Sequence, residues 1–319
     1  MDICAGPSGV VACRDMAARW LPYLALAIGL GGLGFTGFFV RWAGAPGPVA
    51  GFYRVTIAAL VMALPVAEQT RREKARQGDS LHGPNRLIGF SQRHLLLAVL
   101  AGVFFAGDLA AWNTSVFMTN VANATLLGNT APIWVSLGAL LLFKEKLGPG
   151  FWASLGLAML GAVVILGGDF VAHPTLGLGD LLATVAGVFY GAFLLATQRA
   201  REGLGALLTW WVAACASGVM LLLISLALRQ PITGYSSATY LYLIAAALVS
   251  QVAGYISVSY ALGHLPASIV SPALLGQPVL TALLAIPLLH ESLGWGQVVG
   301  GLLVLGGIAL LLRHRSTTA

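Results

Sequence analysis

Long apolar stretches alternate with short polar ones along almost the whole chain. Each stretch spans about 17–25 residues, the length that an α-helix needs to cross a bilayer. The apolar runs are continuous rather than alternating, so we expect helices and not strands. The pattern predicts an all-α integral membrane protein with ten transmembrane helices, at residues 20–41, 48–67, 94–117, 120–143, 149–168, 177–198, 204–228, 238–262, 265–289 and 294–312.

The predicted connections are short except for one. Residues 68–93 are polar and charged and include Gly83 and Pro84, so we expect a mobile loop there, with or without a helical turn. Residues 1–19 and 313–319 are predicted to be cytoplasmic tails.

Composition agrees with a membrane protein and excludes several classes of function. Of 319 residues 58% are hydrophobic and 9% charged, against about 25% charged in soluble proteins. The net charge of +6 comes from basic residues in short loops, which argues against a nucleic-acid partner. Cys4, Cys13 and Cys215 have no metal-binding or disulfide spacing, so we expect no metal and no cofactor. The chain has no G-x-x-x-x-G-K-[ST] motif, which argues against ATP as the energy source, and no repeated filter motif, which argues against a selective channel.

The basic residues also predict an orientation. With the N-terminus inside, only Arg41 and Arg229 fall outside the cell, and Arg54 lies within a span. Both termini are therefore expected in the cytoplasm. The basic residues on the cytoplasmic side would be Arg14, Arg19, Arg71, Arg72, Lys74, Arg76, Arg86, Arg93, Lys144, Lys146, Arg199, Arg201, Arg313 and Arg315.

An internal repeat divides the chain into two halves. Residues 132–161 recur at 278–307 without a gap, at an offset of 278 − 132 = 307 − 161 = 146. The shared features include a proline and the pattern Glu-x-Leu-Gly-x-Gly, which begins at Glu145 and again at Glu291. This combination indicates a duplication, with repeats at 20–168 and 177–312.

Five spans per copy is an odd number, so the second copy would cross the membrane in the opposite sense. Glu145 would then lie at a cytoplasmic corner and Glu291 at an external one. Inverted repeats are typical of secondary transporters, whose substrate site lies near the midplane between the halves.

Particular residues also resemble a known family. Ala122 to Leu127, Pro132 with Glu145, and Pro278 with Glu291 resemble two EamA-type repeats of the drug/metabolite transporter superfamily of ten-helix permeases. The resemblance covers essentially the whole chain after residue 20. The stretch Asp108-Leu109-Ala110-Ala111-Trp112-Asn113 is similar to the branch that exports aromatic and other amino acids. The resemblance implies a central cavity lined by the third, fourth, eighth and ninth spans.

Polar residues inside these spans are the candidate substrate contacts. Polar groups are costly in hydrocarbon, so they are expected to face a wet cavity or to form hydrogen bonds between helices, and both interpretations stay open. Spacing of four residues places Asp108 with Trp112 on one helix face, and Gln251 with Tyr255 and Ser259 on another. The full set of candidates is Asp108, Trp112, Asn113, Asn129, Tyr190, Gln251, Tyr255, Ser259 and Gln277.

Four further residues are candidates for conformational roles. Pro132 and Pro278 interrupt the backbone hydrogen bonds of their helices and are expected to act either as hinges or as packing kinks. Glu145 and Glu291 are each followed by Leu and Gly at a helix end, which favours structural corners over proton-coupling carboxylates.

Arg54 and Asp108 are opposite charges at similar depth on consecutive spans. Arg54 lies about 9 Å and Asp108 about 13 Å from the outer ends of their helices, at 1.5 Å per residue. Each charge alone is costly there, so we expect a pair. The pair is either a permanent structural contact or one that Asp108 leaves for a proton or a substrate ammonium.

The combined expectation is a permease of a bacterial-type inner membrane. It would export small amphipathic metabolites, chiefly amino acids with aromatic or aliphatic bulk, by alternating access, with coupling to protons left open. One alternative is an exporter of cationic drugs or other metabolites. Another is an intramembrane enzyme, because Cys215-Ala216-Ser217-Gly218 resembles part of the rhomboid protease motif.

Overall fold

The computed structural model of the chain describes residues 7–78, 92–119, 121–166, 177–289 and 294–316. All regular secondary structure within these ranges is helical. Glu291, one of the predicted corner residues, lies outside the described residues. The helices of the first half are α1 Pro7–Gly34, α2 Thr36–Ala43, α3 Gly47–Gly78, α4 Gln92–Met118, α5 Val121–Gly128, α6 Ala131–Leu142 and α7 Pro149–Leu166. Those of the second half are α9 Leu178–Ala200, α10 Ala206–Ala227, α11 Ser237–Ala246, the π-helix η1 Ala247–Gly254, α12 Tyr255–Leu262, α13 Ala267–Leu274, α14 Gly276–Leu289 and α15 Trp295–Ser316.

Eight helical segments of the described chain are long and apolar enough to cross a membrane. Two more apolar segments, Leu126–Leu142 and Pro149–Ile165, are shorter. Large apolar side chains such as Leu60, Leu64 and Leu141 point outward, while many alanines are buried, as expected when lipid is the solvent. The protein is therefore a multi-pass integral membrane protein; ten crossings and cytoplasmic termini stay predictions.

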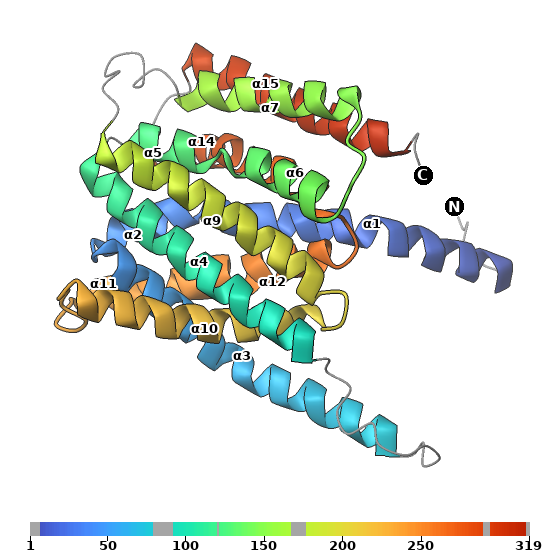
Figure 1. Ribbon diagram of the computed structural model, residues 1–319, viewed down its shortest axis with the longest axis horizontal. Helices are drawn as coiled ribbons and strands as arrows, with labels where there is room; N and C mark the ends of the chain where they lie inside the picture. Colours follow the sequence, from blue (N-terminus) through green and yellow to red (C-terminus); the bar gives the residue numbers. More distant parts are fainter. Residues whose placement is uncertain (1–6, 79–91, 120, 167–176, 290–293, 317–319) are drawn as a thin grey trace.

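The helices of the two halves contact one another in matched combinations. α4 packs along α9, and η1 with α12 packs along α1. α3 packs against α10, and α7 lies beside α15 at one edge of the bundle (Figure 1). If the spans are numbered in order within each half, every one of these pairings has its counterpart when the halves are exchanged. The core thus forms between the halves.

The seam between α7 and α15 depends on glycine. A Cβ atom on Gly161 would lie 2.5 Å from the carbonyl oxygen of Gly300, and one on Gly307 would lie 2.7 Å from that of Ser154. These distances are shorter than van der Waals contact, so the two backbones touch directly. Close backbone approach of this kind is a usual way for membrane helices to associate.

The predicted loop at 68–93 is wrong in part, because its first residues are helical. α3 continues to Gly78, well into the predicted loop, and its last part projects beyond the bundle (Figure 1). Good helix formers and an ion pair of 2.7 Å between Arg72 and Glu68, four residues apart, stabilise this extension. Helix α1 begins earlier, at Pro7, and the candidate membrane span that includes it begins at Trp20, as predicted.

Three predicted spans are each interrupted in the middle. The first breaks at Phe35 between α1 and α2, the fourth between α5 and α6 at Asn129, and the ninth at Leu275 between α13 and α14. The last two breaks are repeat-related, since 275 − 129 = 146. Pro132 and Pro278 each follow their break by three residues and lie in the first turn of the next helix, where a missing N–H is tolerated. Their proposed hinge role stays a prediction.

Candidate functional site

The interrupted helices surround one small cavity. It has a volume of about 140 Å³ and combines polar and aromatic walls. Irregular backbone within a membrane is tolerated where it is buried in protein or lines a wet cavity, and it is typical of transporter sites. The lining residues are Leu33, Thr36, Arg54, Asp108, Leu109, Trp112, Asn113, Gly128, Asn129, Tyr190, Tyr255 and Gln277.

Most of the candidates from the sequence meet at this cavity. α4 contributes Asp108, Trp112 and Asn113, and the break after α5 contributes Asn129. The remaining members come from other helices: Arg54 from α3, Tyr190 from α9, Tyr255 from α12 and Gln277 from α14.

Two lining amides hold neighbouring helices together. Asn113 Nδ2 donates to the carbonyl oxygen of Gly47 at 3.0 Å, and Gln277 Nε2 donates to that of Leu33 at 3.2 Å. A Cβ atom on Gly47 would lie 2.0 Å from the Cβ of Asn113, so only glycine fits at the start of α3. The first bond holds the cavity wall on α4 against α3, and the second holds the wall on α14 against α1.

Arg54 is buried deeply and has a neutral partner. Its exposure is 2%, and that of Gln251 is 0%. With the Gln251 amide oriented so that its oxygen faces the guanidinium, Oε1 accepts from Arg54 Nη2 at 2.7 Å and from Nε at 3.3 Å. The ion pairs found between described residues join Arg72 with Glu68 and Arg199 with Glu202, so Arg54 and Asp108 are not in direct contact here, and their pairing stays a prediction. Arg54 and Asp108 both line the cavity.

Gln251 and Ser259 do not lie with Tyr255 on the cavity wall. Gln251 reaches the cavity only through Arg54, and Ser259 Oγ donates to the carbonyl oxygen of Ala206 at 3.2 Å. For Gln251 the reason is η1, whose i→i+5 hydrogen bonds give wider turns and change the helical phase between Gln251 and Tyr255. Ser259 follows Tyr255 by one turn of the regular helix α12 and lies beyond the cavity lining. The sequence interpretation assumed a regular α-helix through this segment.

An aromatic cluster fills the bundle on the side of the cavity that is predicted to face the cytoplasm. Tyr255 stacks on Trp210, and Phe105 contacts both Tyr255 and Phe193, each pair with ring centroids 4.8 Å apart. Phe105 and Phe193 lie one turn from Asp108 and Tyr190, toward the ends of α4 and α9 that are predicted to be cytoplasmic. The rings of Phe105, Phe193 and Trp210 are almost fully buried. This cluster therefore separates the cavity from that end of the protein.

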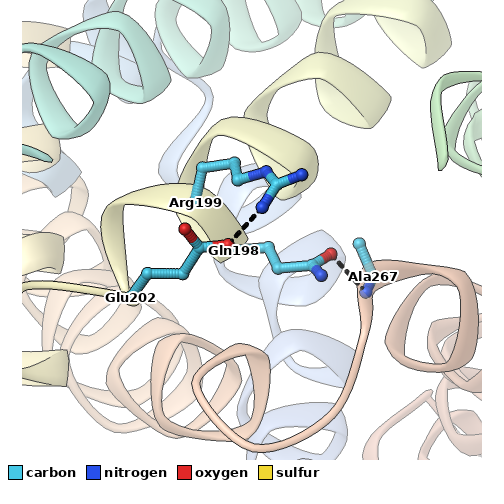
Figure 2. A network of polar contacts seen from close by, with 4 residues as sticks. All are labelled: Gln198, Arg199, Glu202 and Ala267. Carbon is cyan, nitrogen blue, oxygen red and sulfur yellow. Dashed lines mark hydrogen bonds and ion pairs between the residues drawn. The ribbon is translucent and has the colours of Figure 1, made fainter. Parts of the chain in front are cut away.

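The same end is fastened by two hydrogen bonds, one between the two halves and one within the second half. Glu145 accepts a hydrogen bond of 2.6 Å from Ser268 Oγ, across 123 residues of chain. Gln198 Oε1 accepts one of 2.7 Å from the N–H of Ala267, beside the Arg199–Glu202 ion pair (Figure 2). Glu145 thus contacts the first turn of α13.

A second hollow lies between α3 and α10. Its volume is about 320 Å³, its walls are apolar, and Leu60 and Val219 at its rim are exposed. It faces the lipid side of the bundle and has no charged lining residue. Ser217, the residue behind the enzyme alternative, is buried nearby and donates to the carbonyl oxygen of Gly102 at 2.7 Å. The polar central cavity is therefore the candidate substrate site.

Comparison with known proteins identifies the family. The model of the EamA-like transporter family matches residues 19–167 and again residues 177–313. The chain belongs to this family of transporters. The match confirms the resemblance to EamA-type repeats, while the amino-acid-exporting branch stays a prediction.

Two further comparisons place this EamA-like transporter. It is 30% identical over 109 residues to a riboflavin transporter of Rhizobium johnstonii (strain DSM 114642 / LMG 32736 / 3841), and the alignment spans 33% of each chain. A protein of known crystal structure has the same fold, with a TM-score of 0.73 at 17% identity, over 92% of this chain and 98% of that one.

Sequence reasoning missed several residues at the site of this EamA-like transporter. Thr36 lines the cavity from the first turn of α2, and Leu33 from the end of α1. Phe105, Phe193 and Trp210 looked like ordinary apolar residues of their spans. The spacing of one turn between Phe105 and Asp108 was the one available signal for the aromatic cluster.

Proposed function

We propose that this protein is a secondary transporter that exports small amphipathic metabolites, with amino acids as the principal substrates. The family match supports transport of a small molecule across a membrane. The observation that carries the substrate class is the central cavity, where a buried cation and an acidic residue, Arg54 and Asp108, lie among aromatic walls. Such a cavity suits a compact solute with opposite charges and an apolar side chain.

Cavity size also favours small substrates. Pockets for drug-sized ligands have volumes of roughly 300–1,000 Å³, whereas this cavity has about 140 Å³. The rings of Trp112, Tyr190 and Tyr255 provide flat apolar walls for aliphatic or aromatic side chains.

Alternating access is the proposed mechanism. The aromatic cluster and the contacts of Glu145 and Gln198 close one end of the protein, while the cavity lies nearer the opposite end of α4. The matched contacts between the halves support inverted repeats, in which one half rocks against the other around a fixed site. Release of the closed end would open the cavity to the cytoplasm.

A vitamin is the second candidate substrate, because one relative is a riboflavin transporter. The aromatic walls could stack on a flat ring system. The small volume and the two charged lining residues argue against it in this conformation.

The first prediction is therefore a selective release of amino acids from proteoliposomes. Purified protein is reconstituted with labelled phenylalanine, leucine or threonine inside, and with riboflavin or a cationic dye in parallel vesicles. We expect the amino acids to leave faster than from protein-free vesicles, and riboflavin and the dye to leave at the protein-free rate. Release of riboflavin or the dye alone would contradict the proposed substrate class. Repeating the assay with an imposed pH gradient distinguishes proton antiport from facilitated efflux.

A further inference from the structure

We propose that the substrate is recognised as a zwitterion that bridges Arg54 and Asp108, and that Gln251 is a positioning residue for this recognition. The substrate carboxylate binds the Arg54 guanidinium, and its ammonium faces Asp108. This inference rests on the proposed transport function and names the chemistry that selects the substrate.

The first argument is the unusual partner of Arg54. A guanidinium has five N–H donors and keeps its charge, and a buried charge usually has a counterion. Gln251 Oε1 accepts only from Nε and Nη2 and carries no charge. Arg54 is also one of the residues that line the cavity. A carboxylate, which binds guanidinium groups in a bidentate manner, would supply both the missing charge and the missing acceptors.

The second argument is the position of Asp108. It lines the same cavity, yet it does not form a direct ion pair with Arg54 among the interactions of the described residues. The two charges thus face a shared space from α3 and α4. An α-amino acid carries its carboxylate and ammonium two bonds apart on one carbon, so it can satisfy both. The hydroxyl of Thr36, buried in the lining without a hydrogen-bond partner in the described structure, is a further polar contact.

The third argument is the rigid placement of Gln251. It lies in η1, and the neighbouring Ser250 Oγ donates to the carbonyl oxygen of Gly32 at 2.9 Å. A Cβ atom on Gly32 would lie 2.6 Å from the carbonyl oxygen of Val249, so η1 and α1 are in direct backbone contact. This packing holds the Gln251 oxygen against Arg54. A neutral amide orients the guanidinium without neutralising it, and the charge remains available for the substrate.

The second prediction tests the bridge with three forms of one side chain. The probes are L-phenylalanine, its amide, which is a cation, and 3-phenylpropionate, which is an anion. Transport into or out of proteoliposomes and binding to the purified full chain are measured for each. We expect phenylalanine to have an affinity about 10- to 100-fold higher than either analogue, the size of one lost hydrogen-bonded charge contact.

Variants assign each charge. In Asp108→Asn the preference for phenylalanine over 3-phenylpropionate should disappear, and in Arg54→Gln the preference over the amide should disappear. Folded yield is measured by size-exclusion chromatography. If either single variant does not fold, the comparison of the three probes on the wild type still decides the proposal.

Gln251→Glu distinguishes positioning from simple packing. A carboxylate keeps the hydrogen bonds to Arg54 and adds a permanent counterion, so folded yield should be retained while the affinity for phenylalanine falls about tenfold or more. The matched control is Ser217→Ala, which removes a buried hydrogen bond to the carbonyl oxygen of Gly102, outside the cavity lining and away from Arg54 and Gln251. It should leave the ratio of affinities for the three probes unchanged.

The outcomes separate this inference from the proposed function. If the anion, the cation or riboflavin is transported as well as phenylalanine, the zwitterion bridge is wrong while the transport function stands. If no compound of either panel is transported by the folded wild type, the proposed function itself is wrong. Wild-type affinity in Gln251→Glu would overturn the positioning role.

Discussion

Trp112 forms a wall of the central cavity from the second half of α4. A Cβ atom on Gly128 would lie 3.0 Å from Trp112 Cδ1, so the indole packs directly on the backbone before the break between α5 and α6. The width of the cavity at this point therefore depends on one ring and one glycine.

The third prediction concerns this wall. Trp112→Ala should widen the cavity, raise the KM for leucine and phenylalanine about tenfold through lost contacts, and admit larger solutes such as riboflavin. The matched control is Trp152→Ala on α7, which is outside the cavity lining. Transport of leucine and phenylalanine, and of riboflavin, is measured at equal amounts of folded protein. A substrate range identical to that of the wild type would show that the ring does not select substrates.

At the scale of residues, the sequence was a better guide to which polar groups lie together than to which of them form pairs. Asp108, Trp112 and Tyr255 reach one cavity because intramembrane polar groups avoid lipid. The partner of Arg54 could not be predicted in the same way. Coulomb reasoning points to the nearest opposite charge, and Gln251 is neutral and lies 251 − 54 = 197 residues away.

At the scale of helices, interruption is the recurring feature of the site. The breaks at Asn129 and Leu275 and the π-helix η1 lie beside the cavity, whose lining includes Asn129, Tyr255 and Gln277. Continuous apolar runs cannot reveal such breaks, because the same residues suit a straight helix. The prolines at 132 and 278 were the one local signal, and they marked the first turns after the breaks.

The α7–α15 seam gives the fourth prediction. Gly161→Ala places a Cβ atom against the backbone of α15 and should destabilise the protein by about 1–3 kcal/mol. Gly156 lies on the same helix but is exposed, and a Cβ atom there would meet open space. Gly156→Ala should stabilise it by up to about 1 kcal/mol through helix propensity. The difference in melting temperature between the two variants is measured in detergent by heating each protein and monitoring the loss of its monodisperse peak. Equal melting temperatures would mean that the seam tolerates side chains.

At the scale of the molecule, the two halves depend on each other. Contacts of α4 with α9 and of α1 with α12 build the walls of the cavity from both repeats. The duplication was readable in the sequence because Pro, Glu and Gly recur at a fixed offset. The packing of the two halves against each other could not be read from the sequence, because the residues of one span do not indicate which helix lies beside it.

The fifth prediction tests the inverted topology. Single cysteines are placed at Lys146 and at Trp295, both exposed, in a chain without its three native cysteines. A membrane-impermeant maleimide should label Trp295→Cys in intact cells and Lys146→Cys only after permeabilisation, because the inverted repeats place the two corners on opposite sides. Labelling of both in intact cells would contradict an odd number of spans between them.

The long separation of Arg54 and Gln251 has a consequence for biosynthesis. Ribosomes add about 5–20 residues per second, so Arg54 precedes Gln251 by roughly 10–40 s. During this interval the first half must keep a guanidinium in the bilayer without its final acceptor, at a cost of about 2.5–3.5 kcal/mol near a helix centre. Asp108, only 108 − 54 = 54 residues later, is the first acidic side chain inside a span that can accompany it. During synthesis an acidic side chain of the same half is therefore available to Arg54 before its neutral partner from the other half exists.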